Sequence, residues 1–120
     1  MLVITQSQFD AMQQDAVRIL ARRIATDLRA FCQPVVRALS DGDLEGQLVG
    51  AIGQARAFGL VTDQDLTSFA KLTIVVGPRF FEHPPFHAAL ADADTPARLR
   101  MRDLLFAASD EDWKAAARQR

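Results

Sequence analysis

The chain has 120 residues, of which 49% are hydrophobic and 24% are charged, and its fourteen basic and fifteen acidic side chains give a net charge of −1. This length and composition suit one globular domain with its own core, and they exclude wholesale disorder. Acids and bases are nearly balanced in both halves of the chain, so we expect no field that attracts nucleic acid or anionic lipid.

The first predicted helix begins at a capping box, in which Thr5 and Gln8 satisfy each other's free backbone amides. Apolar residues then recur at steps of three and four, which predicts one buried face along a long helix. This face comprises Phe9, Met12, Ala16, Ile19, Leu20, Ile24, Leu28 and Phe31. Pro34 ends or kinks the helix, because proline lacks the amide donor and clashes with the preceding turn.

A second helix is predicted from about 44 to 58, and Gly59 is placed to end it in the left-handed conformation. Its expected inward residues are Leu44, Leu48, Ile52, Ala55 and Phe58. A third helix opens at a Thr62 cap, and its expected inward residues are Leu66, Phe69, Leu72 and Val76. The β-branched run 73–76 is also typical of a strand, but the helical period before it and the Gly77-Pro78 stop favour a helix.

Residues 79–87 form an irregular aromatic segment, because Pro84-Pro85 interrupts a regular helix. Pro85 is expected to open a short helix that runs to Leu90. Thr95-Pro96 then predicts a capped helix, whose expected inward residues are Leu99, Met101, Leu104, Leu105 and Ala108. Ser109 opens a last short helix that carries Trp113. The sequence therefore predicts an all-α fold, a compact bundle of five to six helices in a single domain over residues 1–120.

Cysteine content and the N-terminal residues indicate the cellular setting. The lone cysteine, Cys32, excludes an internal disulfide and with it a secreted disulfide scaffold. The first six residues lack the basic region of a signal peptide, and the longest strongly apolar run, 72–76, is far too short for a membrane span. We therefore expect a cytoplasmic protein.

Three groups of residues invite a chemical interpretation, and each lacks a required part. The acidic stretch 41–46 opens like a calcium loop, but the position that needs a bidentate glutamate holds Ile52. His83 and His87 have the spacing of helical zinc ligands, with Glu82 beside them, but two prolines lie between the histidines. Cys32 has no histidine near it in the sequence to act as a base. We expect no catalytic residue, no metal and no cofactor.

Two features favour binding to another protein. Gly42, Gly46 and Gly50 are spaced by four, which indicates close approach of another helix in the fold or a seam between two copies in a homodimer. In the aromatic segment, Phe80 and Phe86 are expected to cover the core, whereas Phe81 is the best single candidate for an exposed contact. The residues predicted to bind a partner are Arg79, Phe81, His83, Phe86 and His87.

Short motifs along the chain carry a resemblance to a known group of proteins. The motifs are Ile4-Thr5-Gln6 with Gln8-Phe9, then Ala57-Phe58-Gly59-Leu60 followed by 63–66, then Val76-Gly77-Pro78-Arg79-Phe80 with Pro84 or Pro85 and Phe86 beyond. In this pattern, over about residues 3–107, the chain resembles small helical accessory proteins encoded beside effector, spike and adaptor genes of bacterial type VI secretion systems. Those proteins have an Asp and a Trp at the places held here by Phe81 and Phe86.

The resemblance implies a non-enzymatic chaperone or adaptor that holds a secreted effector or its loading segment. Three alternatives are left open by the sequence. An immunity protein would block a toxin's basic site with the acidic run 110–112. A metal-dependent enzyme subunit would use Glu82, His83 and His87. A self-associating helical protein would use the glycine row. In the leading interpretation the partner is another protein, and neither nucleic acid nor membrane is expected.

Overall fold

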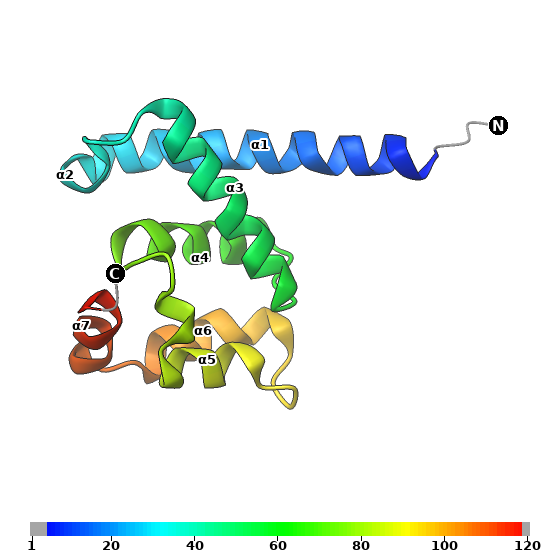
Figure 1. The fold of residues 1–120 in the computed structure, drawn as a ribbon. Coiled ribbons are helices and arrows are strands. Elements are labelled where there is room, and N and C mark those ends of the chain that lie inside the picture. Colours follow the sequence, from blue (N-terminus) through cyan, green and yellow to red (C-terminus); the bar gives the residue numbers. More distant parts are fainter. Residues whose placement is uncertain (1–4, 119–120) are drawn as a thin grey trace.

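The computed structural model describes residues 5–118, and within this range the chain forms seven α-helices, one 3-10 helix and no β-strand (Figure 1). In chain order the elements are α1 (Gln6–Phe31), α2 (Gln33–Val36), α3 (Asp41–Ala57), α4 (Asp63–Val75), η1 (Phe80–Glu82), α5 (Pro84–Ala91), α6 (Ala97–Ala107) and α7 (Asp110–Arg118). The predicted all-α class is confirmed. The seven α-helices include α2, which is a single turn after Phe31. None of the helices in the described range is long and apolar enough to cross a membrane.

Helix α3 lies in the middle of the fold and packs against α1 on one side and α4 on the other. Its sequence predicts one buried face, because apolar residues repeat every three or four positions along it. The residues on this face are fully or almost fully buried, and they are Leu44, Leu48, Ala51, Ile52 and Ala55. The helix begins three residues earlier than predicted, since the hydroxyl of Ser40 accepts a hydrogen bond from the Asp43 amide and caps it.

Helix α1 begins at the predicted capping box, in which the Thr5 amide donates to Gln8 Oε1 at 2.9 Å and the Gln8 amide donates to Thr5 Oγ1 at 3.2 Å. A helix of 26 residues is about 39 Å long, and its N-terminal end projects beyond the other helices (Figure 1). Leu20, Ile24 and Leu28 are buried in its second half, and Val17 before them is partly buried against the core.

The prediction of one buried face along all of α1 is wrong. Met12 and Ile19 are each 59% exposed, Phe31 is 85% exposed and Ala16 is exposed as well. Met12, Ala16 and Ile19 follow at steps of four and three, so they form a second strip that is turned away from the strip of Leu20, Ile24 and Leu28. The side chain of Phe9, predicted on the same face, lies outside the described part of the chain.

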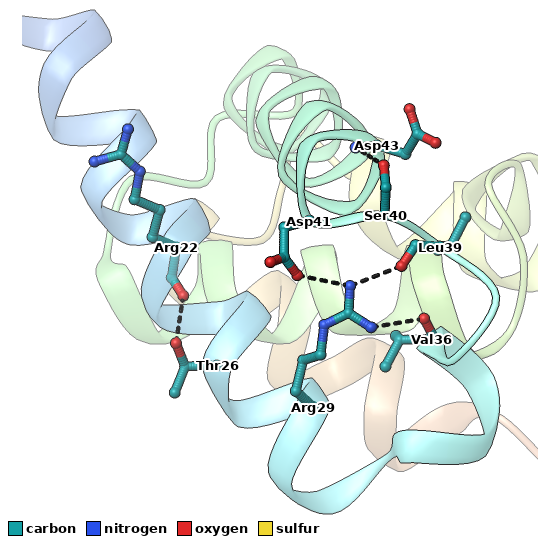
Figure 2. A network of polar contacts seen from close by, with 8 residues as sticks. All are labelled: Arg22, Thr26, Arg29, Val36, Leu39, Ser40, Asp41 and Asp43. Carbon is teal, nitrogen blue, oxygen red and sulfur yellow. Dashed lines mark hydrogen bonds and ion pairs between the residues drawn. The ribbon is translucent and has the colours of Figure 1, made fainter.

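Arg29 joins the end of α1 to the start of α3 (Figure 2). Its guanidinium donates to the carbonyls of Val36 at 2.9 Å and Leu39 at 2.7 Å, and it forms an ion pair with Asp41 at 2.9 Å. The carbonyls belong to α2 and the turn after it, where helix ends leave acceptors unpaired. One planar cation therefore fixes the path of the chain between two long helices.

The predicted turn at Gly59 is confirmed, with φ at +88°. This left-handed conformation suits glycine, because it lacks the Cβ that other residues would strain there. Arg100 of α6 donates from Nη1 to the Phe58 carbonyl at 2.7 Å, so this turn is also tied to the second half of the chain. Thr62 then caps α4 by accepting a hydrogen bond from the Asp65 amide at 3.1 Å.

The β-branched run that follows is helical, as the sequence favoured, because α4 continues to Val75. The hydroxyl of Thr73 donates to the Phe69 carbonyl at 3.0 Å, so this buried polar group has a hydrogen-bond partner within its own helix. Leu66, Phe69 and Ala70 are fully or almost fully buried, whereas Leu72 and Val76, also predicted inward, are half-buried.

Three predictions about later helices are corrected. Thr95 does not cap α6, since Pro96 is the N-cap residue and the Thr95 hydroxyl donates to Asp92 Oδ2 at 2.7 Å instead. Leu105, predicted inward, is exposed, whereas Met101 and Leu104 are buried as predicted. Helix α5 begins at Pro84, one residue before the predicted start.

Arg29→Ala is expected to lower the free energy of unfolding by about 1–3 kcal/mol, because the partly buried carbonyls of Val36 and Leu39 lose a charged hydrogen-bond donor. Chemical denaturation followed by circular dichroism measures the change. Arg18→Ala removes an exposed arginine from the same helix and should change stability by less than about 0.5 kcal/mol. Equal losses in both variants would contradict the bridging role of Arg29.

Candidate partner-binding groove

The aromatic segment 79–87 forms η1 and the first residues of α5 and lies over the core. Phe80 is fully buried, with its ring centroid 5.1 Å from that of Phe69 in α4. The prediction that Phe80 and Phe86 cover the core is therefore confirmed. Residues 80–82 form η1, and Pro84 fits the first position of α5, because the amide that proline lacks would make no hydrogen bond within the helix there.

One side of this segment holds α7 in place. The ring centroids of Phe86 and Trp113 are 4.5 Å apart, and His83 packs edge-on against Phe86 at 5.3 Å. His83 Nε2 lies 3.6 Å from Asp112 Oδ1, while Nδ1 is buried and has no hydrogen-bond partner among the described residues. Phe86 is only 1% exposed, so its predicted role in binding a partner is corrected to a role in the core.

The other side of the segment reaches the surface. Phe81 is half-buried, with its ring 5.8 Å from Phe58 and 5.7 Å from Phe69. His87 is exposed and sits edge-on to Phe58 at 6.0 Å. Arg79 is exposed and forms an ion pair with Glu82 at 2.9 Å. Of the five predicted residues, Arg79, Phe81 and His87 therefore offer surface to a partner, and His83 and Phe86 face α7.

Phe81 forms one wall of a groove of about 410 Å³ between α3, α4 and the segment that follows α4. We call this hollow the Gly50 groove, and its lining residues are Gln47, Gly50, Ala51, Gln54, Thr73, Pro78 and Phe81. Gly50 has no side chain to fill the space, and a Cβ built on it meets no described atom within 4 Å. Of the residues that line the groove, only Phe81 was predicted from the sequence to bind a partner. The spacing of the glycines in α3 was the only other sequence feature that pointed to this surface.

The expectation that another helix of the fold packs closely on the glycine row is wrong. A Cβ built on Gly42, Gly46 or Gly50 meets nothing within 4 Å among the described residues, and Gly53 on the same helix is equally open. All four glycines lie on the exposed side of α3, away from Leu44 and Leu48. The row is therefore a smooth outer surface of the helix.

The three candidate metal ligands are engaged elsewhere. Glu82 pairs with Arg79, His83 lies near Asp112, and His87 packs on Phe58. Over the described residues, no three histidine, cysteine or acidic side chains lie together in a group that could hold a metal ion. Cys32 is half-buried and ends α1, where its amide donates to the Leu28 carbonyl at 2.7 Å.

The chain matches no protein-family model, no curated protein and no solved structure. The likeness to type VI secretion accessory proteins therefore stays an expectation drawn from the sequence motifs.

Asp112 connects the aromatic segment to the start of α7. The Ser109 amide donates to Asp112 Oδ2 at 3.0 Å, and this hydrogen bond is the main cause that holds the pKa of Asp112 below the ordinary 3.8. Burial acts in the opposite direction, while the Ser109 hydroxyl and His83 lower the pKa further. The Asp112 amide in turn donates to Ser109 Oγ at 3.2 Å, so the two residues form a reciprocal cap on α7.

Because the pKa of Asp112 is lowered in the folded protein, its carboxylate stabilises the fold above the unfolded pKa, and this contribution is lost as the pH falls through the folded pKa. Asp112→Asn should therefore lower the melting temperature at pH 7, and the difference from wild type should shrink as the pH falls toward about 3. Melting curves of both proteins across this range test it. Asp94→Asn, an exposed aspartate outside the cap, is the control. A difference that does not change with pH would contradict the charge-based explanation.

Proposed function

We propose that the chain is a non-enzymatic binding protein that holds a segment of a larger protein in the Gly50 groove, and that it serves as an accessory chaperone or adaptor for a type VI secretion effector. The groove supports the binding role, since it presents a half-buried aromatic ring beside a glycine with open space above it. The sequence motifs support the assignment to type VI secretion.

The groove suits a helical or extended segment with a large apolar side chain. Phe81, Pro78 and Ala51 supply apolar walls, and an incoming side chain can reach the backbone of α3 at Gly50. Gln47 and Gln54 lie seven residues apart on α3 and on either side of Gly50. Their exposed amides can both donate and accept hydrogen bonds, which suits the polar edges of a bound segment.

Co-expression with each large protein encoded beside the gene, followed by sizing with light scattering, tests the proposal. We expect a stable complex with one of them, and we expect Gly50→Leu to abolish it by filling the groove. The substitution should leave the fold intact and raise the free energy of unfolding by about 0.5–1 kcal/mol, because leucine favours a helix more than glycine does.

Gly46→Leu is the matched control, since Gly46 lies one turn earlier on the same exposed side and does not line the groove. It should gain similar stability and keep the complex. Loss of the complex in both variants, or in neither, would show that the partner binds elsewhere. If the chain protects cells that express the partner as a toxin, the immunity function applies in place of the chaperone function.

A further inference from the structure

Helix α7 is held against the rest of the molecule through side chains and not through its backbone. Trp113 packs on Phe86 with the ring centroids 4.5 Å apart, and Ala116 is 1% exposed. Asp112 Oδ1 lies 3.6 Å from His83 Nε2. Across the described part of the chain, no backbone hydrogen bond joins α7 to another element. The position of α7 therefore depends on these few side chains.

The contact between α7 and His83 is incomplete. The 3.6 Å separation of His83 and Asp112 exceeds the upper range of an N–H···O hydrogen bond, which is about 3.2 Å. The His83 side chain is only 13% exposed, and its Nδ1 is buried without a hydrogen-bond partner among the described residues. A buried polar group in this state costs free energy. A competing segment that pairs better with His83 therefore has an advantage over α7.

Helix α7 also has little stability of its own. It contains nine residues, and isolated helices shorter than about 12–15 residues are marginal in water. The reciprocal cap of Ser109 and Asp112 satisfies its first turn but adds no contact with the core. Docking and folding of α7 are therefore coupled. Segments of this kind open locally while the core of a protein stays folded.

The surface beneath α7 is supported from the core. Phe86 lies in the first turn of α5 and also packs against Phe80, with the ring centroids 6.1 Å apart. Phe80 is fully buried and packs on Phe69 of α4. His83 is the N-cap residue of the same helix α5. Release of α7 therefore uncovers an aromatic ring beside an imidazole in a site that is already formed, and aromatic rings are typical anchors of interfaces.

We infer that α7 is a releasable latch over a binding site formed by His83 and Phe86, and that a helical segment of a partner protein displaces it. The chemistry of α7 defines this segment: a carboxylate in its first turn, at the place of Asp112, followed directly by a large aromatic side chain, at the place of Trp113. The carboxylate meets the imidazole and the aromatic side chain stacks on Phe86. The site shares no residue with the Gly50 groove, so the inference does not rest on the proposed function.

A dye-labelled peptide of residues 108–118, added to the full chain and followed by fluorescence anisotropy, tests the inference. Trp113→Ala in the full chain removes the ring that covers Phe86. We expect the peptide to bind this variant with a Kd on the order of 10–100 µM. The wild type should bind it roughly 10- to 100-fold more weakly, because its own α7 occupies the site at an effective concentration of about 1 mM.

Two controls show where the peptide binds. Phe106→Ala removes a ring of α6 that is 84% exposed, so this variant should bind the peptide as weakly as the wild type does. A peptide with Trp113→Ala should bind the opened variant at least about 10-fold more weakly, because it lacks the ring that stacks on Phe86. Binding to neither protein, or equal binding to the wild type and the opened variant, would overturn the inference.

Amide hydrogen exchange of the wild type measures release of the latch directly. The same tethering predicts that the amides of α7 are protected by no more than about 100-fold, whereas those of α3 require global unfolding to exchange. The circular dichroism spectrum of Trp113→Ala should keep the helical signal of the core. Protection of α7 equal to that of α3, or unfolding of Trp113→Ala, would show that α7 is an inseparable part of the core and no latch.

Discussion

Packing of α3 between α1 and α4 is the contact on which the other features depend. Its inner face buries Leu44, Leu48 and Ile52 completely, so the positions of both neighbours are set by side-chain packing on this helix. Because the inner face is occupied, the glycines of α3 lie on the outer side. The Gly50 groove lies where this outer side meets the residues that follow α4.

The aromatic segment links the two halves of the molecule. Phe80 packs on Phe69 of α4, and Phe86 packs on Trp113 of α7, so one short segment contributes rings to both sides. This structural use of the rings reduces the surface available to a partner. Phe81 combines a structural role with an exposed one, since its ring contacts Phe58 and Phe69 and also lines the groove.

The sequence by itself determined the helices and most of their ends. Thr5, Ser40, Thr62 and Ser109 each form a cap through contacts within three residues, and Gly59 adopts the left-handed turn that glycine permits. These are local interactions, so a short stretch of chain contains all the information they need. The first residue of α5 and the N-cap of α6 each lie one residue away from the predicted position. In both cases a proline is next to the predicted residue or replaces it, and proline is accepted at several positions around the start of a helix.

Only the tertiary structure decided which apolar residues are covered. Met12 and Leu20 look equivalent in the periodic pattern, but Leu20 lies on the side of α1 that packs in the core, whereas Met12 lies on the side that is turned away from it. Likewise, Phe81 and Gly50 are 31 positions apart, and their meeting in one groove depends on how α3 and α4 cross. Burial depends on where other segments end in space, and helical periodicity within one segment carries no record of that.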